Sequence, residues 1–240
     1  MSDSPHDPNQ PRLFAFAMEE RSAATLVVGP SNQLASELCA RWRSWPGGTA
    51  IISGPPSSGR SHVAHAWAQT AHAGVFEPRT ETVGAAFSAH DGRLLVDDAD
   101  LTLDEDALIR LFDLARYEQG TVLLVVAPPP SLWAVKTPDL RSRILAAPTA
   151  RLEEPDESLL NVVLRRLCRD RYMELSPEAA HYLVNRMERS FAAARGIVEV
   201  LDRQVIQGAR PISVIAARKA LEDWYALRGD DPSQEIDAAS

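Results

Sequence analysis

Cysteine is scarce in this chain, which has only Cys39 and Cys168 among its 240 residues. Both lie in helical patterns, without the spacing of a metal site or a redox pair. This argues against a secreted scaffold held together by disulfides. We expect both thiols to be small buried residues, as suits a reducing cytoplasm.

Long apolar runs and an excess of positive charge are also lacking. No run approaches the ~18–20 apolar residues of a membrane span, and the polar, acidic residues 1–11 are typical of neither a signal nor a transit peptide. The formal net charge of −8 argues against a nucleic-acid footprint spread over the surface, although a local basic patch stays open. The hydrophobic fraction of 45% supports a core for one α/β domain and a smaller companion. We expect a cytoplasmic protein without membrane contacts.

The most informative pattern is a short apolar strand, a glycine-bounded loop and a helix within residues 49–62. The loop matches the phosphate-binding motif G-x-x-x-x-G-K-[ST], except that Arg60 stands where lysine is expected. The two glycines permit a backbone that turns its N–H groups inward, and the helix offers its positive end to a phosphate. Ser61 supplies a hydroxyl for Mg²⁺. The residues expected to bind nucleotide here are Gly54, Pro55, Pro56, Ser57, Ser58, Gly59, Arg60, Ser61 and His62.

Arg60 changes the expected chemistry of this loop. Its planar guanidinium is not equivalent to a compact ammonium between the β- and γ-phosphates. We therefore expect nucleotide binding rather than fast hydrolysis. The alternative is an ordinary Gly/Pro/Ser turn between a strand and a helix.

A second pattern, residues 93–98, is an apolar run that ends in two carboxylates, as a Walker B segment does. An acid at the C-terminal end of a buried parallel strand points to the crevice where ligands bind in open α/β sheets. Asp97 is expected to hold Mg²⁺, directly or through water, and Asp98 is the candidate to polarise the attacking water. The alternative is a solvated turn.

Apolar periodicity gives the order of the elements. Strands are expected near 49–53, 74–77, 93–97 and 121–126, and helices near 32–42, 60–72 and 103–118, which predicts a parallel α/β sheet sandwiched by helices. From residue 155 only helices follow, near 155–169, 176–187, 190–206 and 213–226. The expected organisation is a flexible tail (1–15), a nucleotide-binding α/β domain (16–152), a small all-α lid (153–227) and a disordered tail (228–240).

Together these motifs resemble the DnaA/Hda family of AAA+ proteins over roughly residues 10–225. Residues 27–32 resemble the segment that leads into the nucleotide site of this family, which adds Val28 to the expected nucleotide contacts. Residues 139–144 resemble the family's arginine-finger box, in which Ser142 and Arg143 align with the Ser-Arg pair. The resemblance implies bound ADP or ATP with Mg²⁺, and Arg143 as a finger that acts in trans on DnaA. The alternative for Arg143 is a solvated arginine at a helix start, and Arg141 is the weaker finger candidate.

The sequence departs from the family in the parts that sense the γ-phosphate. The strand end at 127–130 lacks the usual polar sensor residue, and Ala192 aligns with the second sensor arginine. Arg189 and Arg195, about one helical turn away on either side, are the candidate substitutes. These losses leave diphosphate binding intact, so we expect an ADP-bound form with weak or no ATPase activity of its own.

The N-terminal residues Gln10, Leu13 and Phe14 resemble the Q-x-x-L-F peptide that docks on the bacterial sliding clamp, the β subunit of DNA polymerase III. The amide can bond at a pocket rim while the two apolar side chains fill the pocket. The alternative is that Leu13 and Phe14 fasten the tail to the core. Because no DNA-binding domain of the DnaA type is expected, DNA would be reached only through the clamp.

The resemblance therefore implies a negative regulator of replication initiation. Attached to the clamp, it would stimulate ATP hydrolysis by DnaA, and self-association through the AAA+ interface is a further implication. Two alternatives stay open: an active AAA+ ATPase such as a helicase or clamp loader, and a DNA-binding factor like the initiator itself.

Overall fold

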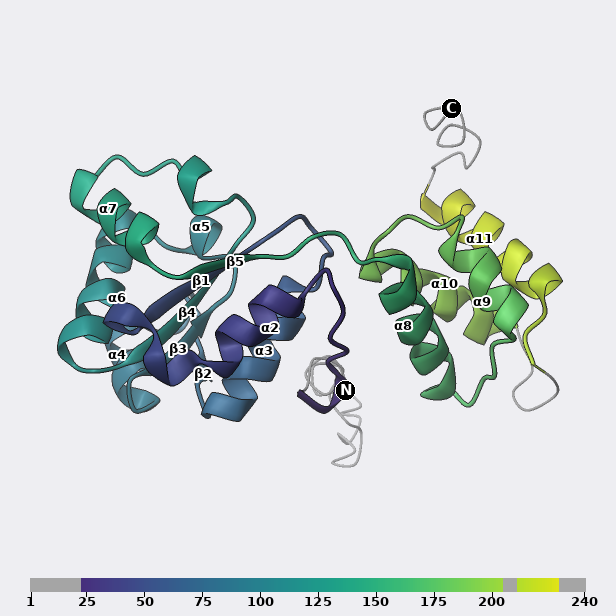
Figure 1. Cartoon of the computed structure of the whole chain (residues 1–240), viewed down its shortest axis with the longest axis horizontal. Helices are drawn as coiled ribbons and strands as arrows, with labels where there is room; N and C mark the ends of the chain where they lie inside the picture. Colours follow the sequence, from purple (N-terminus) through teal and green to yellow (C-terminus); the bar gives the residue numbers. More distant parts are fainter. Residues whose placement is uncertain (1–22, 205–210, 229–240) are drawn as a thin grey trace, which may run out of the picture.

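A computed structural model describes residues 23–204 and 211–228, which form a five-stranded parallel sheet with helices on its faces and a separate bundle of helices (Figure 1). The strand order is β2-β3-β4-β1-β5, and every neighbouring pair is parallel. The strands are β1 (Thr49–Ser53), β2 (Gly74–Val75), β3 (Arg93–Val96), β4 (Thr121–Val126) and β5 (Thr149–Arg151).

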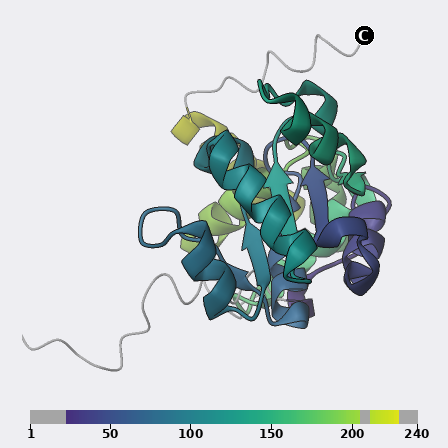
Figure 2. The same ribbon diagram turned by 90° about the vertical axis from the view of Figure 1, so that its left-hand side faces the viewer.

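The central strands β1 and β4 are buried along their whole length, as expected of strands covered on both faces. Neighbouring residues of β1 enter different cores: Ile51 packs with α4, α6 and α7, whereas Ile52 packs with α2 and α3. Figure 2 shows this sheet part in front, with helices on both sides of the strands. Its α-helices are α2 (Gln33–Ala40), α3 (Arg60–Ala71), α4 (Val83–Ala89), α5 (Ala99–Thr102), α6 (Glu105–Tyr117) and α7 (Pro138–Ala146). The short 3-10 helices are η1 (Ala23–Thr25), η2 (Trp42–Ser44), η3 (Pro46–Gly48) and η4 (Pro130–Leu132).

The helical part has a hydrophobic core of its own, separate from the two cores of the sheet. Two of its helices begin at side chains that cap the first turn, Asp156 and Ser176. Asp156 accepts a hydrogen bond from Leu159 N at 2.9 Å, and Ser176 accepts one from Ala179 N at 3.1 Å. The four helices are α8 (Glu157–Arg169), α9 (Pro177–Val184), α10 (Phe191–Gln204) and α11 (Val214–Arg228).

The predicted parallel α/β sheet with helices is confirmed, and the apolar runs 49–53 and 121–126 form β1 and β4 with the predicted bounds. The sequence patterns missed α4, α5 and β5 and gave no bounds for α7. The proposed clamp motif and both predicted terminal tails lie outside the described residues, apart from residue 228. Within the two described ranges, no helix combines the length and apolarity that a membrane span requires.

Candidate nucleotide site

The loop between β1 and α3 has backbone angles that most L-residues avoid. Gly59, at φ +94°, directly precedes the first residue of α3, and Ser57 also has a positive φ of 58°. A Cβ atom added to Gly59 would lie 2.8 Å from Cε2 of Phe191. The amide of Phe191 in turn donates a hydrogen bond to the carbonyl oxygen of Ser57 at 3.3 Å. The start of α10 therefore contacts the loop directly, and glycine at position 59 is required both by its backbone angle and by the aromatic ring.

A cavity of about 660 Å³ opens between the loop and the helical part. From the sheet part it is lined by Thr25, Leu26, Val27, Asn32, Ser57, Gly59, Arg60, Ser61 and His62. The helical part contributes Leu159, Val163, Arg166, Leu167, Asp170, Arg171, Phe191, Ala192 and Arg195. Apolar side chains from both parts therefore share the cavity with several guanidinium groups.

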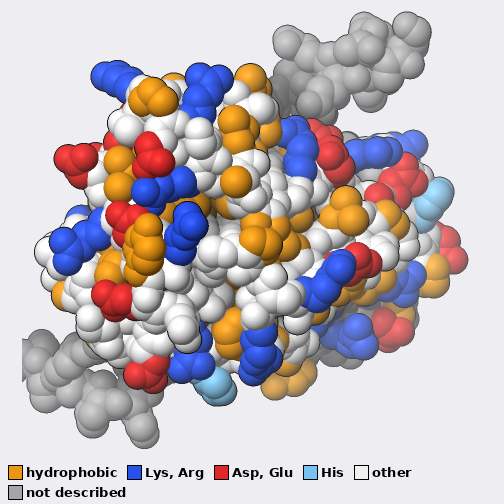
Figure 3. All heavy atoms as spheres, turned by 60° about the vertical axis from the view of Figure 1, so that its left-hand side comes forward, with side chains coloured by type: hydrophobic (Ala, Val, Ile, Leu, Met, Phe, Trp, Pro, Cys, Tyr) orange, Lys and Arg blue, Asp and Glu red, His pale blue; other side chains and the backbone are white. Residues whose placement is uncertain are grey.

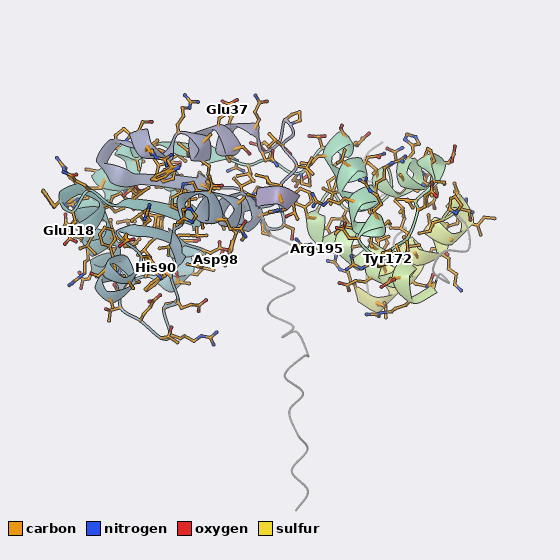
Figure 4. The ribbon with its side chains drawn as sticks, turned by 90° about the horizontal axis from the view of Figure 1, so that it is seen from below. Glu37, His90, Asp98, Glu118, Tyr172 and Arg195 are labelled. Atoms are coloured by element: carbon orange, nitrogen blue, oxygen red, sulfur yellow. The ribbon has the colours of Figure 1, made fainter. Side chains whose placement is uncertain are left out.

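Arg60 and Arg195 are the two lining arginines without a hydrogen-bond or ion-pair partner among the described residues. Nη1 of Arg60 is buried and unsatisfied. Arg195 is half-buried and lies where the sheet part meets the helical part (Figure 4). By contrast, Arg166 pairs with Asp170 at 3.8 Å and Arg171 with Asp202 at 3.9 Å. Unpaired guanidinium groups in a partly buried cavity favour an anionic ligand.

Only one of the two candidate second-sensor arginines lies at this cavity. Nη2 of Arg189 is 2.8 Å from Oε1 of Glu157, and both side chains of that pair are more than half exposed. Arg189 is absent from the cavity lining, whereas Arg195 belongs to it. Ala192, in the aligned sensor position, also lines the cavity.

In the segment that leads into the site, the residues at the cavity are not the one that the sequence predicts. Val28 is 56% exposed and does not line the cavity, whereas Thr25, Leu26 and Val27 do. Asn32 fixes this segment, because its side chain accepts a hydrogen bond from Gly29 N and donates one to Val27 O, both at 2.9 Å. Thr25 Oγ1 also lies 2.9 Å from Nε2 of His62.

The two carboxylates after β3 lie at the C-terminal end of the strands, as the loop after β1 does. Ser53 at the end of β1 pairs with Val126, and Val96 at the end of β3 pairs with Leu124, so one strand separates the two sites. Asp97 is half-buried, and its Oδ1 accepts a hydrogen bond from Asp98 N at 3.1 Å. Asp98 is exposed, lies in the sheet part in Figure 4, and has a positive φ of 49°. A serine hydroxyl at the loop and a carboxylate at this end of the strands are the oxygen ligands that Mg²⁺ prefers.

Arg143 lies on α7, outside the cavity lining. Its Nη1 contacts Asp113 Oδ1, and its Nε contacts Asp139 Oδ2 at 2.8 Å. The hydrogen bond to Asp113 raises the pKa of Arg143 above its ordinary value, and Asp139 adds to this effect. Arg141 on the same helix is exposed. The finger candidate therefore does not face the cavity of its own chain.

Sequence reasoning missed the contribution of α8. Val163 and Arg166 of α8, and Asp170 directly after it, line the cavity. The amphipathic pattern of α8 marks one face as buried in the helical core, but nothing in the pattern says that part of the polar face turns toward the loop.

No protein-family model matches the sequence. An uncharacterised protein of Haemophilus influenzae is 29% identical over 118 residues, which are 49% of this chain and about half (51%) of that protein's length. Domain III of the replication initiation protein DnaA from Thermotoga maritima superposes with a TM-score of 0.67 at 18% identity, over 92% of this chain and 99% of that chain. DnaA from Aquifex aeolicus bound to AMPPCP gives a TM-score of 0.59 at 17% identity, over 76% of this chain and 65% of that chain.

A motor protein outside the initiators is similar to the same extent. The RuvB Holliday junction branch migration motor of T. maritima has a TM-score of 0.65 at 16% identity, over 86% of this chain and 72% of that chain. At such identities the likeness establishes the architecture, which DnaA and RuvB share. The chain therefore has the fold of these proteins, a parallel sheet with a glycine-containing loop between β1 and α3 and a helical part beside the sheet.

Proposed function

We propose that this chain binds an adenine nucleotide in the cavity, hydrolyses it poorly, and stimulates ATP hydrolysis by DnaA through Arg143. One observation carries the proposal. The cavity is lined by Arg60 and Ser61 and has Ala192 at the aligned second-sensor position, while Arg143 lies outside its lining.

Nucleotide binding is supported by the loop and by Arg60 and Arg195, whose guanidinium groups have no partner within residues 23–204 and 211–228. The loop amides and Arg60 would hold the α- and β-phosphates, with Ser61 and Asp97 as ligands for Mg²⁺. Apolar side chains from both parts would hold the base; they include Leu26 and Leu159. AMPPCP is bound to the similar A. aeolicus DnaA. ADP is the nucleotide that we propose for this chain.

Weak hydrolysis is supported by three replacements around the γ-phosphate position. Arg60 takes the place of the lysine, Ala127 follows β4 in place of a polar sensor residue, and Ala192 stands at the second sensor position. Asp98 remains as a group that could polarise water. Because phosphoryl transfer depends on positioned charge, these losses reduce turnover more than binding.

Action on a partner is supported by Arg143, whose helix α7 is part of the sheet domain but not of the cavity. An arginine supplied in trans neutralises charge on the transferring phosphoryl group and contributes ~10³–10⁵ in rate. We propose ATP-bound DnaA as the partner, with contact through the surfaces that AAA+ proteins use to assemble, which also allow self-association.

Attachment to replicating DNA is proposed to occur through the sliding clamp, by Gln10, Leu13 and Phe14. Acidic and basic side chains are interspersed on the face of the sheet part that Figure 3 shows. That mixture suits indirect contact with DNA better than a broad phosphate-binding surface. A clamp-attached activator of DnaA hydrolysis would be a negative regulator of replication initiation.

Three measurements with the purified chain test this proposal. Mass spectrometry of nucleotide released on denaturation should find ADP, and ATP turnover by the chain alone should be near background. Hydrolysis of labelled ATP bound to DnaA should rise when the chain and clamp-loaded DNA are added. Turnover at the rate of a motor ATPase, without any effect on DnaA, would instead favour an active enzyme like the similar RuvB.

A further inference from the structure

We propose that Asp113 on α6 is a positioning residue for Arg143, whose guanidinium it holds through Nη1 while Nη2 stays available for a partner. This inference rests on the proposed function of Arg143. It adds a residue from another helix, one that the sequence motifs do not mark.

Asp113 and Asp139 contact different nitrogens of the Arg143 guanidinium. Asp113 accepts from Nη1 and Asp139 accepts from Nε, whereas Nη2 has no partner among the described residues. Because the group is planar and rigid, contacts at two of its nitrogens fix the direction of the third. The free Nη2 edge is the part left to meet a phosphoryl oxygen of a partner.

Asp113 and Asp139 contribute differently. Asp139 lies four residues before Arg143 on α7, so this contact moves with the helix. Asp113 lies on α6 and therefore ties the guanidinium to the body of the sheet domain. The Arg143 side chain is 26% exposed and that of Asp113 40%, against 63% for Asp139. The contact with Asp113 is therefore the less screened of the two.

α7 itself is fixed on both sides of Arg143. Leu140 and Ile144 are buried in the sheet core, so α7 cannot roll without exposing them. At the start of α7, Glu105 of α6 accepts hydrogen bonds from Lys136 N at 2.7 Å, from Thr137 N at 3.0 Å and from the Thr137 hydroxyl. With the backbone held in this way, the contact with Asp113 decides the direction of the guanidinium.

A pre-placed charge is more effective in a transition state than one that must first be oriented. Asp113 would therefore act on the rate of the stimulated reaction rather than on the affinity between the partners. The same contact could instead be a latch that withholds Arg143. The two roles predict opposite effects when Asp113 loses its charge.

Asp113→Asn keeps the shape of the side chain and removes its charge. Single-turnover hydrolysis of ATP on DnaA, titrated with this variant on clamp-loaded DNA, should show a maximal rate about three- to tenfold lower. The concentration that gives half the maximal rate should stay the same. Asp113→Glu should restore part of the rate, and Asp106→Asn, an exposed position on α6, is the matched control.

The outcomes separate this inference from the proposed function. In an Arg143→Ala background, Asp113→Asn should have no further effect, because it acts through that arginine. An unchanged or increased maximal rate for Asp113→Asn overturns the positioning role, and an increase identifies a latch. Loss of rate that tracks a lowered melting temperature in both Asp113 variants overturns it as well, since the residue would then be structural. If Arg143→Ala itself stimulates fully, the proposed function fails first.

Discussion

At the scale of single residues, the candidate site depends on arginines whose surroundings differ. Arg60 and Arg195 line the cavity without partners among the described residues, whereas Arg189 is held by Glu157 on the surface. The sequence offered Arg189 and Arg195 as equivalent substitutes for the missing sensor. Only the fold of the helical part distinguishes them, because both lie about one turn from Ala192.

Replacing Arg60 by alanine should weaken ADP binding. A hydrogen bond between charged groups is worth about 1.5–3 kcal/mol, which corresponds to roughly a ten- to a hundredfold loss of affinity. Titration calorimetry with ADP and Mg²⁺ measures this directly. An unchanged affinity removes Arg60 from the phosphate site.

Arg195→Ala and Arg189→Ala form a matched pair on and just before α10. The first should lower nucleotide affinity by about tenfold, because it removes a cationic group that has no partner in the described part of the chain. The second should leave affinity within about a factor of two, since an exposed ion pair contributes little. Equal effects of the two substitutions on calorimetric affinity would show that the cavity does not discriminate between them.

At the scale of elements, Glu105 at the start of α6 holds the loop before α7 in place. Glu105 accepts three hydrogen bonds there, and the bond from Lys136 N, followed by that from the Thr137 hydroxyl, lowers the pKa of its carboxyl group. A carboxyl group whose pKa is lower in the folded state stabilises the fold above its unfolded pKa. This contribution is lost as pH falls through the folded value.

Glu105→Gln should therefore destabilise the protein at neutral pH. The difference from the natural chain should shrink as pH falls below the ordinary glutamate value of about 4.3. Asp106→Asn is the control, since it changes the same charge in the first turn of α6 at an exposed position. Urea unfolding at several pH values measures both. A stability difference for Glu105→Gln that does not depend on pH would contradict the claim that Glu105 accepts these hydrogen bonds in its ionised form.

The elements also show what the sequence could predict. Strands β1 and β4 are continuous apolar runs, so their bounds follow from the pattern alone. β5 has one buried residue between two exposed ones, and α4 is seven residues long with a glycine near its start. Such short elements form because neighbouring strands and helices hold them, and that information lies outside their own sequence.

At the scale of the whole molecule, the cavity exists because two separately packed parts face each other. Sequence motifs identified the loop and the carboxylates of Asp97 and Asp98, because each of these features is formed by a few neighbouring residues. The wall formed by α8 and the start of α10 depends on how the helical part is placed against the loop. The place of Val163 and Phe191 at the cavity therefore could not be predicted from the sequence.

The clamp motif belongs to this scale because it connects the chain to other molecules. Leu13→Ala combined with Phe14→Ala should lower clamp affinity at least a hundredfold, since each buried anchor contributes ~1.5–3 kcal/mol. A peptide of residues 8–16 should bind the clamp by itself. Surface plasmon resonance on immobilised clamp measures both, and ADP affinity checks the fold of the double variant. Native clamp affinity in that variant would show that the motif is a chance match.

The most direct test of the central claim is the hydrolysis of ATP bound to DnaA, on clamp-loaded DNA, with the natural chain, Arg143→Ala or Arg141→Ala. The two arginines lie on the same helix, and Arg141 is exposed, so the pair separates a specific role from a general loss of charge. We expect stimulation to fall to background with Arg143→Ala and to persist with Arg141→Ala, while both variants still attach to the clamp. Full stimulation by Arg143→Ala would contradict the account.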